Sequence, residues 1–258
     1  MNKRGQITLF IILAVVIVIG VIFYFIFLRS SAVDTIEGSA AALDGANNVE
    51  SAQSYFERCS QDLLENGAVL LAAQSGYLNP SDTSLFNEGD QIDTVWSRNA
   101  LVPYVLDGNS YSFPYPLRVL EYKLCQYTGS GIKPCFQGFL DSLDAQGFAL
   151  DVGEADVSCQ ASINEEGVSL RLSYPLPIEI AQSRATLTDA YVDTPLRLKK
   201  LYELANLIIT HGGGDASYGN RIRPDQFMEV FMHGDVVIIQ DYASSVGLRA
   251  FFFQFAVR

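Results

Sequence analysis

The stretch DVSCQASINEEGVSLRLSY, residues 156–174, decides the fold class. On both sides of the turn sequence NEEG, apolar residues alternate with polar ones, and this period of two is typical of strands with one buried face. Two such strands joined by a short polar turn predict a β-hairpin. The apolar positions are Val157, Cys159, Ala161 and Ile163 before the turn, and Val168, Leu170 and Leu172 after it.

Around this hairpin, helical and strand patterns are mixed. Apolar residues recur at helical spacing from Val49 onward, which predicts a long amphipathic helix with a weak point at Gly67 and an end at Ser75 and Gly76. The sequence therefore predicts an α+β domain in which helices pack on an antiparallel sheet. Further helices are expected at 117–127, 134–147 and 196–211, and a short one at 224–234. The helix at 196–211 is expected to end at glycines 212–214. Further strands are expected at 175–194, 235–242 and 247–257.

Residues 79–116 combine many turn signals with aromatic residues, five of which lie between positions 96 and 115. Aromatic-rich loops can form a recognition surface, although such residues can also cover a small core. We therefore regard these aromatic side chains as candidate partner-binding residues, with the core interpretation left open. They are Trp96, Tyr104, Tyr111, Phe113 and Tyr115.

The N-terminal 31 residues, MNKRGQITLFIILAVVIVIGVIFYFIFLRSS, contain an uncharged apolar run at 7–28. As a helix it would be roughly 33 Å long, enough to cross the hydrocarbon core of a bilayer. It is longer than the apolar region of an ordinary secretory signal, although Ser30–Ala32 could be read as a cleavage site. Lys3 and Arg4 precede the run, so we expect a cytoplasmic N terminus and an exported remainder.

The exported part would be strongly acidic. All 29 acidic residues follow residue 30, against 14 of the 17 basic residues, which gives that part a net charge of −15. Such a surface repels phosphate backbones, so no nucleic-acid partner is expected. It also means that any self-assembly would need apolar contacts to overcome charge repulsion.

Four cysteines, Cys59, Cys125, Cys135 and Cys159, fall in the exported part. An even number of cysteines in an oxidising compartment predicts two disulfides, for which three pairings are possible. We favour Cys125 with Cys135 across the turn sequence YTGSGIKP, and Cys59 with Cys159 across the core. Zinc is the competing interpretation, but neither a C-x-x-C motif nor a histidine pair at ligand spacing supports it.

No motif specifies a reaction or a cofactor. The sequence HGGG at 211–214 matches the oxyanion loop of some esterases, but the nearby Ser217 lacks the G-x-S-x-G context. Asp141 and Asp144 share one helical face, as solvated residues usually do. We expect a protein that is not an enzyme.

The residues Lys3-Arg4-Gly5-Gln6, followed at once by the apolar run, resemble the class III signal peptide of archaeal type IV pilin-like proteins. In that family a prepilin peptidase cuts after the glycine, which here implies a cut between Gly5 and Gln6 and a helix kept on the mature protein. The fifth mature position would be Phe10, where bacterial pilins carry a glutamate. The stretch 56–78 is also similar to uncharacterised surface proteins of small-genome archaea.

Together these features predict a leader at 1–5, a hydrophobic transmembrane or filament helix at 6–29, a stalk at 30–48 and an extracellular α+β domain at 49–258. The resemblance implies a structural cell-surface protein, a pilin-like subunit of a filament. Its partners would be other copies of itself, the membrane, the peptidase and the pilus assembly machinery. The alternative is a single-pass anchored ectodomain that binds a partner cell, a glycan or an envelope protein.

Overall fold

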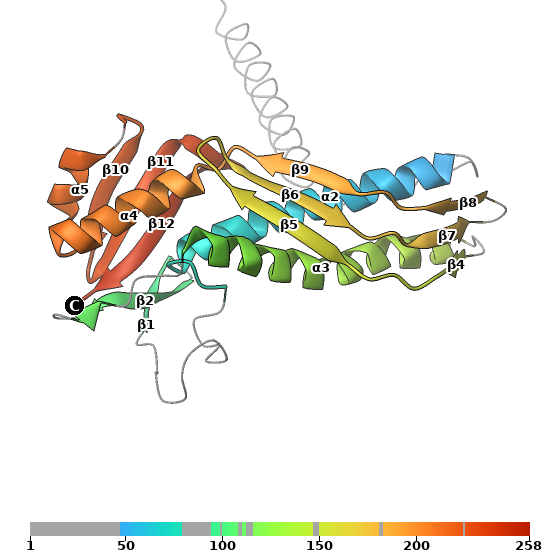
Figure 1. Cartoon of the computed structure of the whole chain (residues 1–258), viewed down its shortest axis with the longest axis horizontal. Coiled ribbons are helices and arrows are strands. Elements are labelled where there is room, and N and C mark those ends of the chain that lie inside the picture. Colours follow the sequence, from blue (N-terminus) through green and yellow to red (C-terminus); the bar gives the residue numbers. More distant parts are fainter. Residues whose placement is uncertain are drawn as a thin grey trace, which may run out of the picture. The chain divides into compact units, whose positions relative to one another are not determined.

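The computed structural model describes residues 47–78, 94–98, 100–107, 110–111, 116–146, 150–180, 183–223 and 225–258 (Figure 1). All of them belong to one compact unit, Gly45–Arg258. The described residues form four helices and three sheets, so the predicted α+β class is confirmed.

Two long helices, α2 (Asn47–Ala73) and α3 (Leu117–Ala145), pack against each other. Their contact is close because glycines lie in it. A Cβ atom on Gly67 would lie 2.6 Å from Leu124 Cδ1, and one on Gly131 would lie 2.5 Å from Leu63 Cδ2. The predicted helix at 49–74 is therefore confirmed, and Gly67 is a packing position rather than a break.

The prediction of two helices separated by a turn at 127–134 was wrong, because α3 runs through this segment without a break. Three glycines and Pro134 inside the helix cost about 6 kcal/mol relative to alanines. Burial of six large apolar side chains along one stripe contributes about 9 kcal/mol or more, so packing outweighs the local preference. The stripe consists of Leu120, Leu124, Ile132, Phe136, Leu140 and Leu143.

Two disulfides join these elements, but not in the pairing that we favoured. Cys59 pairs with Cys135, with Cα atoms 6.1 Å apart, and Cys125 pairs with Cys159, with Cα atoms 5.5 Å apart. Cys125 and Cys135 are ten residues apart on one continuous helix, a separation of about 15 Å. A disulfide bridges at most about 7 Å between Cα atoms, so these two cysteines cannot pair.

The predicted hairpin is confirmed as β5 (Ser158–Ile163) and β6 (Val168–Ser173), with Ile163 opposite Val168. Where we expected one further strand, the chain forms β7 (Pro177–Ile180), β8 (Ser183–Thr186) and β9 (Ala190–Thr194). With β4 (Leu150–Val152), they make two three-stranded sheets, β4-β7-β8 and β5-β6-β9.

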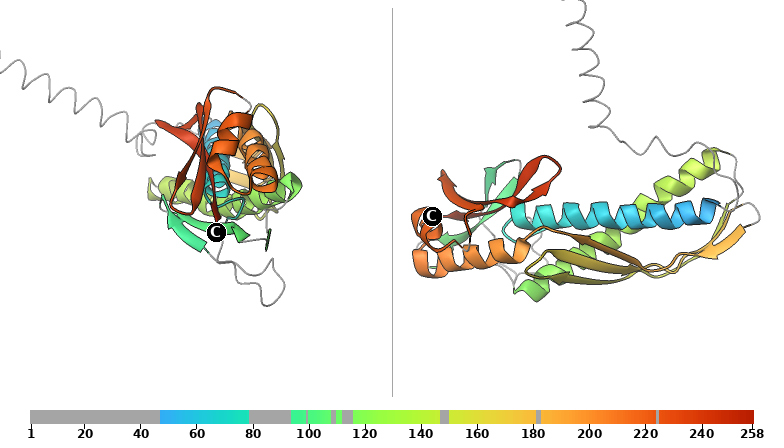
Figure 2. Two further views of the ribbon diagram at one scale, coloured as in Figure 1. Left: turned by 90° about the vertical axis from the view of Figure 1, so that its left-hand side faces the viewer. Right: turned by 90° about the horizontal axis from the view of Figure 1, so that it is seen from above.

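These two sheets are successive lengths of one antiparallel ribbon. Each of its three strands is interrupted once, at 153–157, 174–176 and 187–189. The ribbon lies along the two long helices, with β5 against α3 and β9 against α2 (Figure 2). Val168, Leu170 and Leu172 of β6 are buried, whereas Arg171 between them is exposed.

The remaining strands form a six-stranded sheet with the order β1-β2-β12-β11-β10, and β3 pairs with β2. The predicted strands at 235–242 and 247–257 are confirmed as β11 and β12. The sheet comprises β1 (Thr94–Ser97), β2 (Ala100–Asp107), β3 (Ser110–Tyr111), β10 (Met228–His233), β11 (Val236–Val246) and β12 (Arg249–Val257).

Three features of this sheet differ from expectation. The segment interpreted as loops contains β1, β2 and β3, and the β2–β12 pair is parallel rather than antiparallel. The short helix expected at 224–234 is strand β10, because Met228 and Val230 pair with β11 and bury alternate side chains. Local spacing could not show this, since a short and mostly apolar segment suits either structure.

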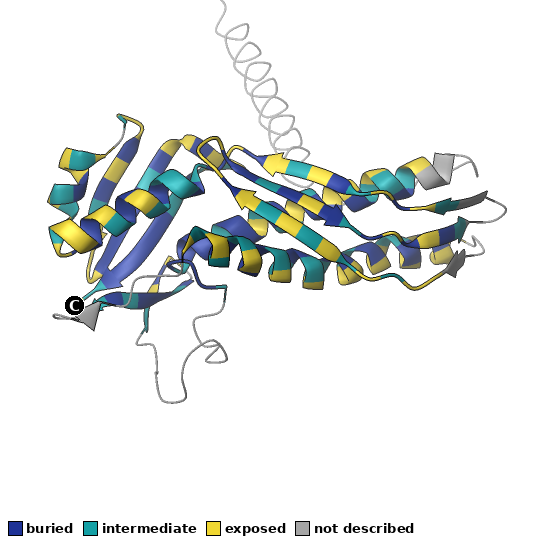
Figure 3. Ribbon diagram, in the orientation of Figure 1, coloured by how far each residue is buried: buried dark blue, intermediate teal, exposed yellow. Residues whose placement is uncertain are grey.

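Helix α4 (Leu198–Gly212) contacts β11 and β12, and its predicted end is confirmed by Gly213, which has a φ of 58°. After these glycines comes the short helix α5 (Ala216–Ile222), which was not predicted and which begins where the Asp215 side chain accepts a hydrogen bond from the Ser217 N–H. Buried residues gather in β11, β12 and the helix faces turned toward the sheets (Figure 3).

None of the four helices in the described residues is long and apolar enough to cross a membrane. The predicted leader, apolar run and processing residues Gly5 and Gln6 lie outside the described residues, as does most of the stalk.

Candidate functional site

Of the five candidate aromatic residues, the structure describes the side chains of two. Trp96 on β1 is 70% exposed. Tyr104 on β2 is half-buried; its hydroxyl donates to Asp235 Oδ2 at 3.0 Å, and the Arg258 guanidinium lies 4.7 Å from its ring centre. The side chain of Tyr111, and Phe113 and Tyr115 as a whole, lie outside the described part of the chain.

Trp96 and Tyr104 do not form one surface. Val95 pairs with Val102, so Val95, Val102 and Tyr104 share one face of the hairpin, which belongs to an apolar cluster with residues of β11 and β12. Trp96 belongs to the opposite face. The β1–β2 hairpin therefore places Tyr104 in a small apolar cluster, which leaves Trp96 as the one exposed aromatic residue of the described pair.

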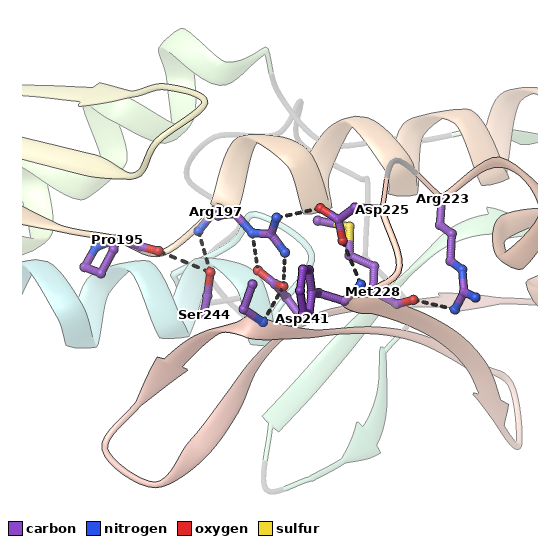
Figure 4. Close-up of polar contacts among 9 residues, drawn as sticks. Pro195, Arg197, Arg223, Asp225, Met228, Asp241 and Ser244 are labelled. Carbon is purple, nitrogen blue, oxygen red and sulfur yellow. Dashed lines mark hydrogen bonds and ion pairs between the residues drawn. The ribbon is translucent and has the colours of Figure 1, made fainter.

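The strongest polar arrangement that the structure describes is an ion cluster around Arg197 (Figure 4). Arg197 immediately precedes α4, and its guanidinium binds Asp241 of β11 through Nε, at 2.8 Å from Oδ2, and through Nη2. Its Nη1 donates to Asp225 Oδ2 at 2.6 Å. The side chain of Asp241 is 0% exposed and that of Arg197 is 14% exposed, so the cluster is largely shielded from solvent.

The cluster also fixes the backbone around it. Ser244 Oγ accepts from the Arg197 N–H at 3.2 Å and donates to the Pro195 carbonyl at 3.1 Å. Asp241 Oδ1 accepts from the Ala243 N–H at 3.0 Å, at the point where the β11–β12 register shifts. The start of α4 is thereby tied to an irregularity in β11.

These contacts shift the pKa values of Arg197 and Asp225. The hydrogen bonds to Asp241 raise the pKa of the Arg197 guanidinium, although its burial acts in the opposite sense. Burial alone would raise the pKa of Asp225, but hydrogen bonds from Arg197 and from the Phe227 N–H outweigh it and lower that pKa. The guanidinium thus joins the start of α4 to β11 through Asp241 and to the connection before β10 through Asp225.

A groove of about 540 Å³ lies beside α3 at the interruption of the ribbon. Tyr174 and Leu176 line it from the ribbon, and Lys133, Asp141 and Asp144 line it from α3. A neighbouring hollow of about 480 Å³ shares Lys133 and Tyr174 and adds Glu154 and Asp156. The groove is thus acidic, with a single lysine.

Tyr174 is the most informative side chain of this groove. It is 8% exposed, burial raises the pKa of its hydroxyl, and that hydroxyl has no hydrogen-bond partner among the described residues. Together with Lys133, Asp141 and Asp144, this hydroxyl offers polar and charged contacts to a group bound in the groove.

The HGGG segment does not assemble an esterase site. Ser217 Oγ donates a hydrogen bond to Asp215 Oδ2 at 2.6 Å, and His211 Nδ1 lies 2.8 Å from Thr210 Oγ1. Ser217 and His211 therefore bond to different partners and not to each other. The glycines instead turn the chain between α4 and α5. Among the described residues, no group of three or more His, Cys, Asp or Glu side chains could hold a metal ion.

Sequence reasoning missed the Arg197 cluster, although one signal was present. Ile239 and Asp241 are alternate residues of β11 and share its buried face, so an acid stands where an apolar residue is expected. Such an acid needs a buried cation, and Arg197 supplies it. The groove had no comparable signal, because it exists only where the ribbon is interrupted.

No protein-family model, curated protein or solved structure matches this chain. Its function must therefore be argued from its own residues.

Proposed function

We propose that this chain is a structural cell-surface protein, a pilin-like subunit of an extracellular filament or appendage. One observation carries the proposal: Lys3-Arg4-Gly5-Gln6 directly precedes an uncharged run long enough to cross a bilayer. The N terminus would be cytoplasmic and the described unit would lie outside the cell, either anchored in the membrane or in a filament.

The disulfides support export. Cys59–Cys135 joins the two long helices, and Cys125–Cys159 joins α3 to β5, so both link separate elements of the core. Disulfides of this structural kind persist mainly in oxidising compartments. The net charge of −15 after residue 30 agrees with a well-solvated surface that stays soluble outside the cell.

The mechanism would be physical rather than catalytic. Prepilin peptidase would remove residues 1–5, and the assembly machinery would move the apolar helix from lipid into a bundle of like helices. Lipid tails and aliphatic side chains are similarly apolar, so close packing between helices decides whether the helix is more stable in the bundle than in lipid. In water, about 1.5–3 kcal/mol for each large apolar side chain would hold the bundle together.

The second candidate is a single-pass anchored ectodomain that binds a partner cell, a glycan or an envelope protein. The exposed Trp96 and the acidic groove at Tyr174 favour it, since both offer binding chemistry away from the apolar run.

Electron microscopy of cells that carry the wild-type chain or Gly5→Val separates the two candidates. The filament proposal expects appendages with the wild-type chain, none with Gly5→Val, and appendages again with the control Thr8→Ala. Wild-type cells that display the protein at the surface without filaments would support the anchored ectodomain instead.

A further inference from the structure

Strand β10 ends the six-stranded sheet. Among the described strands it pairs only with β11, so its other side is a sheet edge. The backbone groups of Val230 point to this edge, and by the two-residue period of a strand those of Met228 and Met232 do so as well. An edge of this kind is a template for another strand, and the segment FMEVFMH at 227–233 has only one acidic residue to discourage pairing.

The side chain of Asn220 on α5 occupies this edge in place of a strand. Its Nδ2 donates to the Val230 carbonyl at 2.5 Å, and its Oδ1 accepts from the Val230 N–H at 3.0 Å. One side-chain amide thus makes the two hydrogen bonds that a neighbouring strand would make to Val230.

Arg223, just after α5, covers the next position along the same edge. Its Nη1 donates to the Met228 carbonyl at 2.7 Å (Figure 4). The connection beyond it is held by Asp225, which binds Arg197. Two of the three outward residues of β10 are therefore covered from the α5 segment.

Helix α5 is held on the edge by docking rather than by its own stability. It has seven residues, far fewer than an isolated helix needs in water, and Gly219 is its one buried residue. A Cβ atom on Gly219 would lie 2.6 Å from Ile208 Cδ1 and 3.1 Å from Val230 Cγ1, so glycine permits the close approach. Gly213 and Gly214, both with positive φ, precede the helix.

We propose that α5 is a detachable cap on a strand-addition surface, and that the uncapped edge of β10 pairs with β10 of a second copy of this chain. Antiparallel pairing centred on Val230 places Met228 opposite Met232 and Glu229 opposite Phe231. No like charges meet, and each outward residue exchanges both of its backbone hydrogen bonds with the partner copy. The inference depends only on the described unit, not on the proposed function of the N-terminal segment.

The test compares the self-association of the full chain with that of Asn220→Ala in the same detergent, by sedimentation over a hundredfold range of concentration. Asn220→Ala removes both bonds to Val230, and we expect self-association at least about tenfold tighter than in the wild type. Arg221→Ala is the matched control, because Arg221 lies on the same helix and its guanidinium stacks on the ring of Tyr218 rather than on β10. It should behave as the wild type.

A second substitution tests the surface itself. The Met232 N–H points to the edge, so Met232→Pro removes no bond to β11 but blocks strand addition. Adding Met232→Pro to Asn220→Ala should restore wild-type behaviour. Association that persists in the double variant, or an Asn220→Ala chain that associates no more than the wild type, would overturn the proposal.

Hydrogen exchange of the wild-type chain tests the cap without any variant, should Asn220→Ala fail to fold. The Val230 amide is held only by a side chain of α5, whereas the Phe231 amide is held within the β10–β11 ladder. If α5 detaches without unfolding of the sheet, Val230 exchanges at least about tenfold faster than Phe231. Equal rates would overturn the idea of a detachable cap.

Discussion

Replacing Arg197 by methionine should destabilise the described unit more than any other single charge removal. The change removes the cation that pairs with the Asp241 side chain at 0% exposure and with Asp225, while the methionine roughly keeps the aliphatic volume. Breaking a buried ion pair from one side costs about 3–5 kcal/mol, because the remaining charge stays desolvated. For a unit of this size, each kcal/mol lowers the Tm by about 2–4 °C, so the expected fall is about 6–20 °C.

The assay is chemical denaturation followed by fluorescence and circular dichroism, with calorimetry for the Tm. The matched control is Arg171→Met, because Arg171 forms a similar pair with Asp189 at an exposed position and should change stability far less. Combining Arg197→Met with Asp241→Leu removes both charges and should recover most of the loss. A loss below about 1 kcal/mol in Arg197→Met, or no recovery in the double variant, would refute a buried, mutually compensating pair.

Three further predictions concern pH, the disulfides and the helix contact. The pKa of Asp225 is lowered in the folded chain, so its stabilising contribution is present above the ordinary aspartate value of about 3.9 and is lost as the pH falls through the lower folded pKa. The free energy of unfolding of Asp225→Asn should therefore depend less on acid pH than that of the wild type, and an equal dependence would contradict the lowered pKa. Replacing Cys59 and Cys135 by serine opens a connection across 76 residues and should cost about 4 kcal/mol in denaturant unfolding, whereas no loss would mean that this bridge is not formed. Gly131→Val should cost about 1–3 kcal/mol of stability by overpacking against α2, whereas Gly138→Ala, with open space around its Cβ, should be neutral or stabilising by up to about 1 kcal/mol. Equal effects of the two variants on thermal unfolding would contradict the close contact of α3 with α2 at Gly131.

Elements with a clear period and clear ends could be predicted from the sequence. The β5–β6 hairpin alternates on both sides of a polar turn, and α4 ends at a glycine with positive φ, as its sequence indicates. For these elements the local preference and the tertiary packing agree, so pattern alone is sufficient.

The missed features all depend on partners that are distant in sequence. The glycines and Pro134 of α3 look like a break until their packing on α2 is known, and the wrong disulfide pairing followed from that same assumed turn. Strand β10 is a strand because β11 pairs with it. Asp241 is informative only when its buried face is recognised, and its partner Arg197 is 44 residues away.

The most direct test of the central claim is the intact mass of the mature chain isolated from the membrane or surface fraction of its native cells. The account predicts a chain that begins at Gln6 and retains the apolar run at 7–28. A mature chain that begins beyond Leu28, or one recovered intact from the cytosol with Met1–Gly5 in place, would contradict it.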